Sequence, residues 1–345
     1  MSFQYIQKIP VVSAILNEMP LGEELKAAKE ERDREILDIF KRESDRFLLI
    51  IGPCSADNED AVCEYVNKLA ELQKKVKDKI LIIPRIYTNK PRTTGEGYKG
   101  MAHQPKPGEE PDAVKGLIAI RRLHLRILQE TGLSAADEML YPSNYPYLED
   151  VLSYVAIGAR SVENQQHRLT VSGLDIPVGM KNPTSGDLNV LLNSVQAAQL
   201  PHDFIYQEWE VKTTGNPWAH CILRGAFNRY GQTIPNYHHE NMVELVSLYE
   251  KRHLKNPTII VDCSHANSSK MFSAQPRIAM EILHNVRYSD VLRKYVKGLM
   301  IESYLVEGGA EPSKAVYGQS ITDPCLGWKE SEKLVLQIAD YLSRF

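Results

Sequence analysis

Eight polar or reactive side chains stand at or near the ends of eight apolar, strand-like runs of the sequence. In barrels of alternating strands and helices, the residues that follow the strands gather at one end, where such enzymes build their active sites. Any one of them could instead be an ordinary polar residue of an exposed turn. All eight together indicate a reactive site. They are Cys54, Arg85, Glu138, Arg160, Lys181, Arg224, His265 and Glu302.

Four side chains could together bind a divalent metal ion. Cys54 offers a thiolate and His265 an imidazole. Glu302 offers a carboxylate, and Asp323 in the segment SITDPCLGW offers a second. Such a mixed set of soft and hard ligands suits Mn, Fe, Co or Zn and does not select among them. A histidine after an apolar strand is often structural and the four residues are dispersed, so this chemistry alone leaves a structural role open.

Four basic side chains are expected around the same end of the barrel, namely Arg85, Arg160, Lys181 and Arg224. Their mutual repulsion would be costly unless an anion were bound, and arginine matches carboxylate and phosphate oxygens with two parallel hydrogen bonds. Buried structural ion pairs are the alternative. The strand ends supply only Glu138 for such pairs, because Glu302 is a metal candidate. The set therefore favours a small polyanionic ligand.

A loop of about 23 residues, TNKPRTTGEGYKGMAHQPKPGEE, follows the second strand-like run. Connections at this place usually have only a few residues, and long ones usually carry function. Lys90, Arg92, Thr93 and Thr94 supply two cations and two hydroxyl groups beside Pro91. This stiff arrangement suits a second phosphate. The alternative is a basic turn that is simply solvated.

Short β-rich runs alternate with helical segments from about residue 46 onward, as in βα units. Eight such units fit a closed barrel better than an open sheet. Pro84 removes one backbone donor from the second run, so we expect that strand to bend or to end its regular pairing there. The predicted strands are 47–54, 80–87, 134–140, 155–160, 177–182, 220–225, 258–265 and 298–303, each followed by a helical segment. The predicted helices include 61–76, 111–131, 187–199, 238–252 and 328–344.

Residues 1–45 form an extension outside this pattern, and residues 46–345 form the predicted barrel. The run LGEELKAAKEERDREILDIFKRE predicts a charged helix with a thin apolar stripe. The stripe consists of Leu25, Ile36, Ile39 and Phe40. It suits packing on the barrel or on a neighbouring subunit, and a solvated helix without further role is the alternative.

Composition limits the classes of function. With 345 residues, of which 43% are hydrophobic, the chain can build one large core. A net charge of -3 gives no general basic field of the kind that nucleic-acid binders use. No apolar run approaches the roughly 20 residues of a membrane span, and the start lacks a secretion signal. Five scattered cysteines indicate reduced thiols, so we expect a cytoplasmic protein.

The motifs resemble those of the 3-deoxy-D-arabino-heptulosonate 7-phosphate (DAHP) synthase family, in its short, single-barrel class I. They cover nearly the whole predicted barrel. The matching segments are IGPCS (51–55), NKPRTT (89–94), AIGARSVENQQHR (156–168), PVGMKN (177–182), ILRG (222–225), VDCSHANSSK (261–270), IESYLVEG (301–308) and GQSITDPCLGW (318–328).

This resemblance implies a (β/α)8 TIM barrel and a metal-dependent transferase of the shikimate pathway of aromatic amino acid biosynthesis. The reaction joins phosphoenolpyruvate, erythrose 4-phosphate and water into DAHP and phosphate. The family's metal site corresponds to Cys54, His265, Glu302 and Asp323. Its phosphoenolpyruvate site corresponds to Arg85, Lys90, Glu138, Ala159, Arg160, Lys181 and Arg224, and its erythrose 4-phosphate site to Arg92 and Thr93. Lys90, Glu138, Lys181 and His265 are then the candidate catalytic residues.

The family also implies a homodimer or homotetramer that uses the N-terminal extension as an interface. Its inhibitor pocket lies partly along segments 139–147 and 173–176, where YPSNYP and Asp175 depart from the usual residues. Weak or absent inhibition by aromatic amino acids is therefore expected. A related octulosonate-phosphate synthase, which uses arabinose 5-phosphate, is disfavoured by Pro91 and Arg92 in NKPRTT. An inactive barrel that serves as a sensor would be expected to lose ligands, and none is missing.

Overall fold

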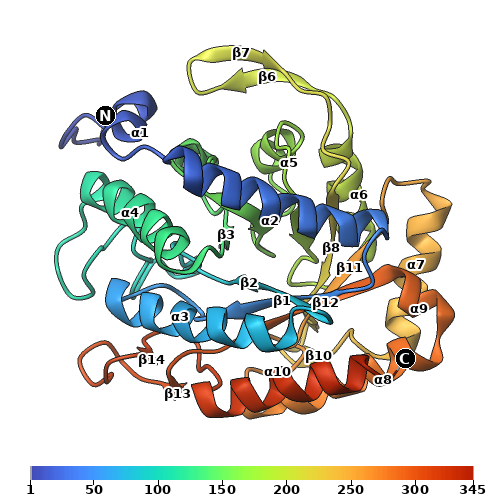
Figure 1. Cartoon of the computed structure of the whole chain (residues 1–345). Helices are drawn as coiled ribbons and strands as arrows, with labels where there is room; N and C mark the ends of the chain where they lie inside the picture. Colours follow the sequence, from blue (N-terminus) through green and yellow to red (C-terminus); the bar gives the residue numbers. More distant parts are fainter. Residues whose placement is uncertain (1, 345) are drawn as a thin grey trace.

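The structure is a computed structural model and describes residues 2–344. At its centre, eight parallel strands form one sheet in the order β2-β1-β12-β11-β8-β5-β4-β3. The sheet curls into a nearly closed barrel surrounded by helices, which confirms the predicted (β/α)8 fold (Figure 1). The strands are β1 (Phe47–Gly52), β2 (Ile80–Pro84), β3 (Ala135–Glu138), β4 (Leu152–Ile157), β5 (Val178–Lys181), β8 (Ala219–Leu223), β11 (Ile259–Asp262) and β12 (Val296–Glu302).

The barrel closes between β2 and β3 with very little backbone pairing. Strand β2 ends at Pro84, as the missing donor of that residue predicts. Beyond it, Arg85 and Ala136 form an isolated parallel bridge, and the amide of Ile86 donates to the carbonyl of Ala136 at 2.8 Å. Contacts other than backbone pairing must therefore help to hold β2 and β3 together at this seam.

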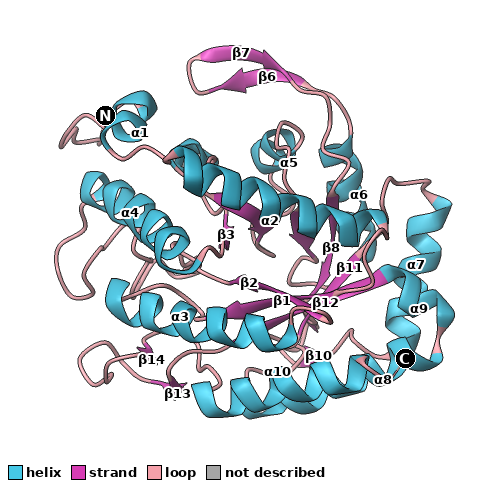
Figure 2. Cartoon of the chain, viewed as in Figure 1, coloured by secondary structure: helices cyan, strands magenta, loops and turns pink. Residues whose placement is uncertain are grey.

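Helices cover the outside of the strands (Figure 2). Side chains at several N-termini accept from free amides, as Asn58 does from Ala61 at 3.0 Å. Strand β3 is followed only by the 3₁₀ helix η1 (Pro142–Tyr147), in which Pro146 lacks the amide that an α-helix would bond to the carbonyl of residue 142. The α-helices of the barrel are α3 (Glu59–Val76), α4 (Ala113–Thr131), α5 (Gln165–Val171), α6 (Leu188–Gln199), α7 (His239–Lys251), α8 (Gln275–Tyr288), α9 (Asp290–Tyr295) and α10 (Trp328–Leu342).

The structure adds small elements that the sequence did not predict. Strands β6 (Asp203–Tyr206) and β7 (Trp209–Lys212) form an antiparallel hairpin that projects from the barrel (Figure 1). Two more short pairs, and the 3₁₀ helix η2 (Phe272–Ala274), lie in the loops between the barrel elements. The pairs are β9 (Ala226–Phe227) with β10 (Thr233–Ile234) and β13 (Val306–Gly309) with β14 (Gln319–Ser320).

The N-terminal extension contains α1 (Val12–Glu18) and α2 (Glu23–Lys41), and α2 packs on the barrel. Ile36, Ile39 and Phe40 of the predicted stripe are fully buried in one cluster with the side chains inside the barrel. Arg32 donates from Nη2 to the carbonyl of Ile82 at 2.6 Å. The stripe was expected to pack on the barrel or on a neighbouring subunit. These three residues pack on the barrel of the same chain. Leu25 is only half-buried.

His220 in β8 lies under α2 and is held neutral. Its Nε2 is 2.7 Å from the hydroxyl of Tyr154, its Nδ1 is 2.9 Å from the carbonyl of Trp218, and its ring contacts Phe40 at 4.8 Å between centroids. Burial lowers the pKa of His220 from 6.5 to about 4, although the Trp218 carbonyl offsets part of this effect. Between pH 6.5 and about 4, this imidazole is therefore protonated in the unfolded chain and neutral in the folded chain.

We expect this histidine to make the fold sensitive to acid. Above pH 6.5 both states hold a neutral imidazole, and as the pH falls from 6.5 towards 4 only the unfolded state gains the proton. The free energy of unfolding should then fall by about 3 kcal/mol from this group. Urea unfolding of wild-type and His220→Gln at pH 7 and pH 4.5 measures it. The variant should lose that part of the pH dependence, and equal slopes would contradict the assignment.

Candidate active site

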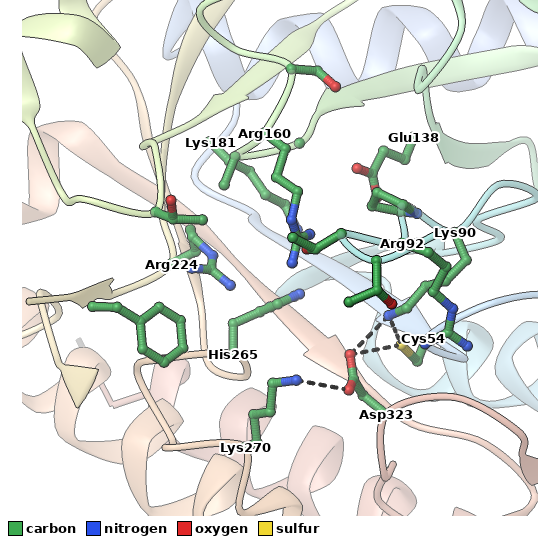
Figure 3. A pocket seen from close by; sticks show the side chains of 18 of the residues that line it. Cys54, Lys90, Arg92, Glu138, Arg160, Lys181, Arg224, His265, Lys270 and Asp323 are labelled. Carbon is green, nitrogen blue, oxygen red and sulfur yellow. Dashed lines mark hydrogen bonds and ion pairs between the residues drawn. The ribbon is translucent and has the colours of Figure 1, made fainter. Parts of the chain in front are cut away.

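A cavity of about 290 Å³ opens at the C-terminal ends of the barrel strands (Figure 3). Every residue that the sequence proposed for the site lines this cavity, with the exception of Glu302. Glu302 is 1% exposed, and its carboxylate accepts hydrogen bonds from Ser264 and from Arg85, which does line the cavity. The lining residues that were proposed are Cys54, Arg85, Lys90, Arg92, Thr93, Glu138, Ala159, Arg160, Lys181, Arg224, His265 and Asp323.

Several other lining residues were missed, among them Thr184, Phe227 and Lys270. Lys270 lies 3.1 Å from Oδ1 of Asp323 and belongs to the motif VDCSHANSSK, so the motif could have suggested it. Phe227 comes from the short strand β9, which has no strong sequence signal. Thr184 follows three residues after Lys181 in a turn that the sequence left unassigned.

The four candidate metal ligands lie in two neighbouring pairs. Cys54 Sγ is 3.6 Å from Asp323 Oδ2, and Lys90 Nζ lies 2.8 Å from each of these two atoms. On the other side, His265 Nε2 is 3.8 Å from Glu302 Oε1. Within residues 2–344 no three such side chains are already arranged around a common metal position. Lys90 instead holds the place between the thiol and the carboxylate.

The chemistry of these donors nonetheless fits a divalent cation. Burial would raise the pKa of both carboxyls, but Arg85 and Lys90 near Glu302, and Lys90 and Lys270 near Asp323, help to hold the pKa of each below its usual value. Burial lowers the pKa of His265, which keeps its imidazole neutral. Burial, with Glu302 nearby, raises the pKa of the Cys54 thiol. Ionised carboxylates and a neutral imidazole are the forms that bind metals, and a bound cation would favour the thiolate.

Arg85 and Lys181 are buried and anchored beneath the cavity. Lys181 Nζ is 3.0 Å from Asp262 Oδ2, and Arg85 Nη2 is 3.1 Å from Glu302 Oε1. The guanidinium of Arg85 also stacks 3.7 Å above the ring of Tyr87. These contacts fix both cations in direction, so little freedom remains to be lost when an anion binds.

Arg224 differs from the two anchored cations. It is 7% exposed, and its Nη1 is buried without a hydrogen-bond partner among the described residues. Burial lowers its pKa, although the charge of Asp262 partly offsets this. Arg160 lies on the same side of the cavity and points into it (Figure 3). A buried guanidinium with an unpaired donor is costly unless a ligand accepts from it. Arg224 and Arg160 therefore favour a bound anion on this side of the cavity.

Glu138 depends on a glycine of the neighbouring loop. A Cβ atom at Gly158 would lie 2.1 Å from Oε1 of Glu138, so any larger residue would displace the carboxylate. The strand end of β3 and the turn after β4 thus fit together to keep an acid beside the cations.

The long loop after β2 brings Lys90 and Arg92 to the rim. The amide of Lys90 donates to the carbonyl of Lys99 at 2.9 Å, and Nε of Arg92 donates to the carbonyl of Tyr98 at 2.9 Å. Thr93 is exposed at the mouth of the cavity. The loop thus adds a second group of anion-binding side chains opposite Arg224.

Comparisons with known proteins agree with this architecture. The model of the DAHP synthetase I family matches residues 22–336. The chain is 38% identical to phospho-2-dehydro-3-deoxyheptonate aldolase of Haemophilus influenzae, over 97% of this chain and 91% of the relative. It is 36% identical to the Phe-sensitive enzyme of that name from Escherichia coli K12, over 95% and 92%.

Among solved structures, phospho-2-dehydro-3-deoxyheptonate aldolase from Francisella tularensis SCHU S4 matches with a TM-score of 0.91 and 32% identity. The match covers 99% of each chain. The relatives therefore share the extension as well as the barrel. This chain belongs to the DAHP synthetase I family.

Proposed function

We propose that the protein catalyses the condensation of phosphoenolpyruvate with erythrose 4-phosphate and water to DAHP and phosphate, the first step of the shikimate pathway. The observation that carries this proposal is the convergence, in one cavity, of two groups of anion-binding side chains with one set of potential metal ligands. Two phosphorylated substrates need two anion sites. Family membership supports the same reaction.

In the proposed reaction Arg85, Arg160, Lys181 and Arg224 bind the phosphate and carboxylate of phosphoenolpyruvate, beside the backbone of Ala159. Arg92 and Thr93 bind the phosphate of the aldose. Holding the two substrates in this way brings the enol carbon to the aldehyde, and such orientation is a large part of the rate enhancement. Carbon–carbon bond formation leaves an electron-poor carbon, which water attacks before phosphate departs. We assign Glu138 and Lys181 to positioning that water and moving its proton, with Lys90, at the phosphoenolpyruvate site, and His265 as further candidate catalytic residues.

We further propose that Cys54, His265, Glu302 and Asp323 hold a divalent ion, which would be Mn, Fe, Co or Zn. When bound there, such an ion supplies Lewis acidity towards the aldehyde carbonyl. The ionised carboxylates and neutral imidazole of this set support the proposal.

The proposed reaction can be tested by following the loss of phosphoenolpyruvate at its ultraviolet absorbance with each aldose phosphate in turn. Turnover should require erythrose 4-phosphate. Faster turnover with arabinose 5-phosphate would instead indicate an octulosonate-phosphate synthase. No turnover with any aldose, in metal-supplemented protein, would favour a binding module.

Arg92→Ala should impair use of the aldose phosphate more than use of phosphoenolpyruvate. A lost charge-assisted hydrogen bond costs on the order of 1.5–3 kcal/mol, so the Michaelis constant for erythrose 4-phosphate should rise roughly tenfold to a hundredfold. Steady-state kinetics with each substrate varied in turn measures this. Lys106→Ala is the control, because Lys106 is exposed in the same loop and lies outside the cavity. A larger effect on phosphoenolpyruvate would contradict the placement of Arg92.

The protein is proposed to act as a homodimer or homotetramer, with residues 1–45 contributing to the subunit contact. Phe3, Tyr5 and Ile6 are each more than four-fifths exposed and supply apolar surface for it. No helix among residues 2–344 is long and apolar enough to cross a membrane. We propose a cytoplasmic location and no nucleic-acid partner, in line with the net charge of -3.

Inhibition by aromatic amino acids should be weak or absent. Segments 139–147 and 173–176 meet at a second cavity of about 290 Å³ below the β6–β7 hairpin, lined by Tyr145 and Leu174. Asp175 is exposed and does not line it, whereas Glu149 does. The carboxylate of Glu149 would repel the carboxylate of an amino acid bound there. Titration of Phe, Tyr and Trp into the assay tests this, and half-maximal inhibition at micromolar concentration would contradict it.

A further inference from the structure

Asp137 occupies the weakest seam of the barrel wall. It lies between Ala136, which faces the barrel interior, and Glu138, which faces the cavity. Its side chain is 3% exposed and points towards α4, where Nε2 of His124 is 3.5 Å from its Oδ2. Backbone pairing between β2 and β3 is limited here to the region of the bridge between Arg85 and Ala136.

The carboxylate of Asp137 joins the two strand ends in place of a regular ladder. Its Oδ1 accepts from the amide of Thr88 at 2.8 Å and from the amide of Glu138 at 2.7 Å. Its Oδ2 accepts from the hydroxyl of Thr88. One side chain thus binds the root of the long loop after β2 and the residue that ends β3.

Both tethered segments carry residues of the cavity. Two residues beyond Thr88, Lys90 reaches between Cys54 and Asp323. The hydroxyl of Thr88 also accepts from Nδ2 of Asn89 at 3.3 Å, which continues the chain of contacts towards Lys90. On the other strand, the amide of Glu138 is fixed by Asp137 while its own carboxylate lies against Gly158.

A contribution to folding stability does not by itself explain a buried aspartate at this position. Removing a carboxylate from water is costly, and the basic group beside Asp137 is a histidine rather than an arginine or lysine. Three hydrogen bonds from one side chain to two chain segments instead restrict how far those segments can move apart. Displacements of about 1 Å in supporting residues are enough to impair a site of this kind.

We propose that Asp137 is a positioning residue, which sets the distance between the Lys90 loop and Glu138 and so preorganises the anion site. This inference rests on the proposed function, because its effect is expressed as affinity for phosphoenolpyruvate. Asp137 itself does not line the large cavity and is not assigned contact with substrate.

The test measures the dissociation constant of phosphoenolpyruvate by calorimetry, which needs no turnover, together with steady-state constants. Asp137→Ala should weaken binding about tenfold or more, since three hydrogen bonds to the carboxylate are lost. Asp137→Asn keeps an acceptor for the two amides and should restore most of the affinity. Thr88→Val keeps the amide and loses the hydroxyl, so its affinity should fall between those of wild-type and Asp137→Ala.

The matched control is Ser153→Ala, which removes a side-chain hydrogen bond to Ser134 beside the opposite end of β3. It should leave the affinity unchanged. A purely structural role would reduce the amount of active protein and the apparent kcat without changing the dissociation constant or KM for phosphoenolpyruvate. That result for Asp137→Ala would overturn the inference.

Two further outcomes are decisive. If Asp137→Ala does not fold, as judged by circular dichroism, wild-type affinity in Thr88→Val would overturn the inference and reduced affinity would support it. If the wild-type protein with added metal neither binds nor consumes phosphoenolpyruvate, the proposed function fails. If the wild-type protein turns over and the Asp137 and Thr88 variants bind phosphoenolpyruvate as tightly as it does, only the inference about Asp137 fails.

Discussion

Replacing Arg224 with methionine should make the protein more stable and far weaker in binding phosphoenolpyruvate. The side chain is buried, and its Nη1 finds no hydrogen-bond partner within residues 2–344. A buried charge that is incompletely paired opposes folding, so an apolar chain of similar length should raise the free energy of unfolding by about 1 kcal/mol. The same change removes a guanidinium that can give two hydrogen bonds to a phosphate. Affinity should fall by roughly a hundredfold or more.

Thermal unfolding with and without phosphoenolpyruvate measures both effects on one sample. Wild-type protein should gain in melting temperature on addition of ligand, whereas Arg224→Met should start higher and gain little. Arg224→Lys is the control, because it keeps the charge and loses the planar pair of donors. It should bind with intermediate affinity. A variant that is less stable and still binds normally would show that Arg224 serves the fold.

Removal of divalent metal should abolish turnover, and Mn, Co or Fe should restore it. A Lewis acid that polarises the aldehyde is worth several kcal/mol of transition-state stabilisation, so activity should fall by roughly a thousandfold or more. Phosphoenolpyruvate affinity should change much less, because the cations of the anion site belong to the chain. Full activity in a preparation shown by elemental analysis to be free of metal would refute the proposal.

Cys54→Ser provides the corresponding change in the protein. The thiol lies in the cavity beside Asp323 and Lys90, and its loss should sharply reduce the bound metal and the activity. Cys63→Ser is the matched control, since Cys63 is a buried cysteine of α3 outside the cavity. It should retain metal. Equal loss of metal from both variants would indicate general damage to the fold.

The eight strands could be predicted from the sequence because buried parallel strands are short, apolar and separated by helical segments. Even the short β3, with its weak β-propensity, is present at Ala135–Glu138. Boundaries were less certain, and β4 begins three residues before the predicted start at 155. The β6–β7 hairpin was missed because its strands have only four residues each and none of these residues is buried.

Most of the side chains that reach the cavity could also be predicted from the sequence. Residues that end parallel strands must emerge at the same end of a barrel, so Arg85, Lys181 and Arg224 could be grouped without coordinates. The motifs then supplied Arg92 and Asp323 from loops, whose positions no periodicity predicts.

The contacts that each of these groups makes became visible only in the folded barrel. Lys90 lies between Cys54 and Asp323, Ile36, Ile39 and Phe40 of α2 are buried against the barrel, and Asp137 meets Thr88 across the seam. Such contacts join residues far apart in the chain, and they depend on side-chain direction and barrel closure. The local sequence pattern predicts on which face of a strand or helix a residue lies. Which side chain it contacts on that face is fixed only when the whole barrel has packed.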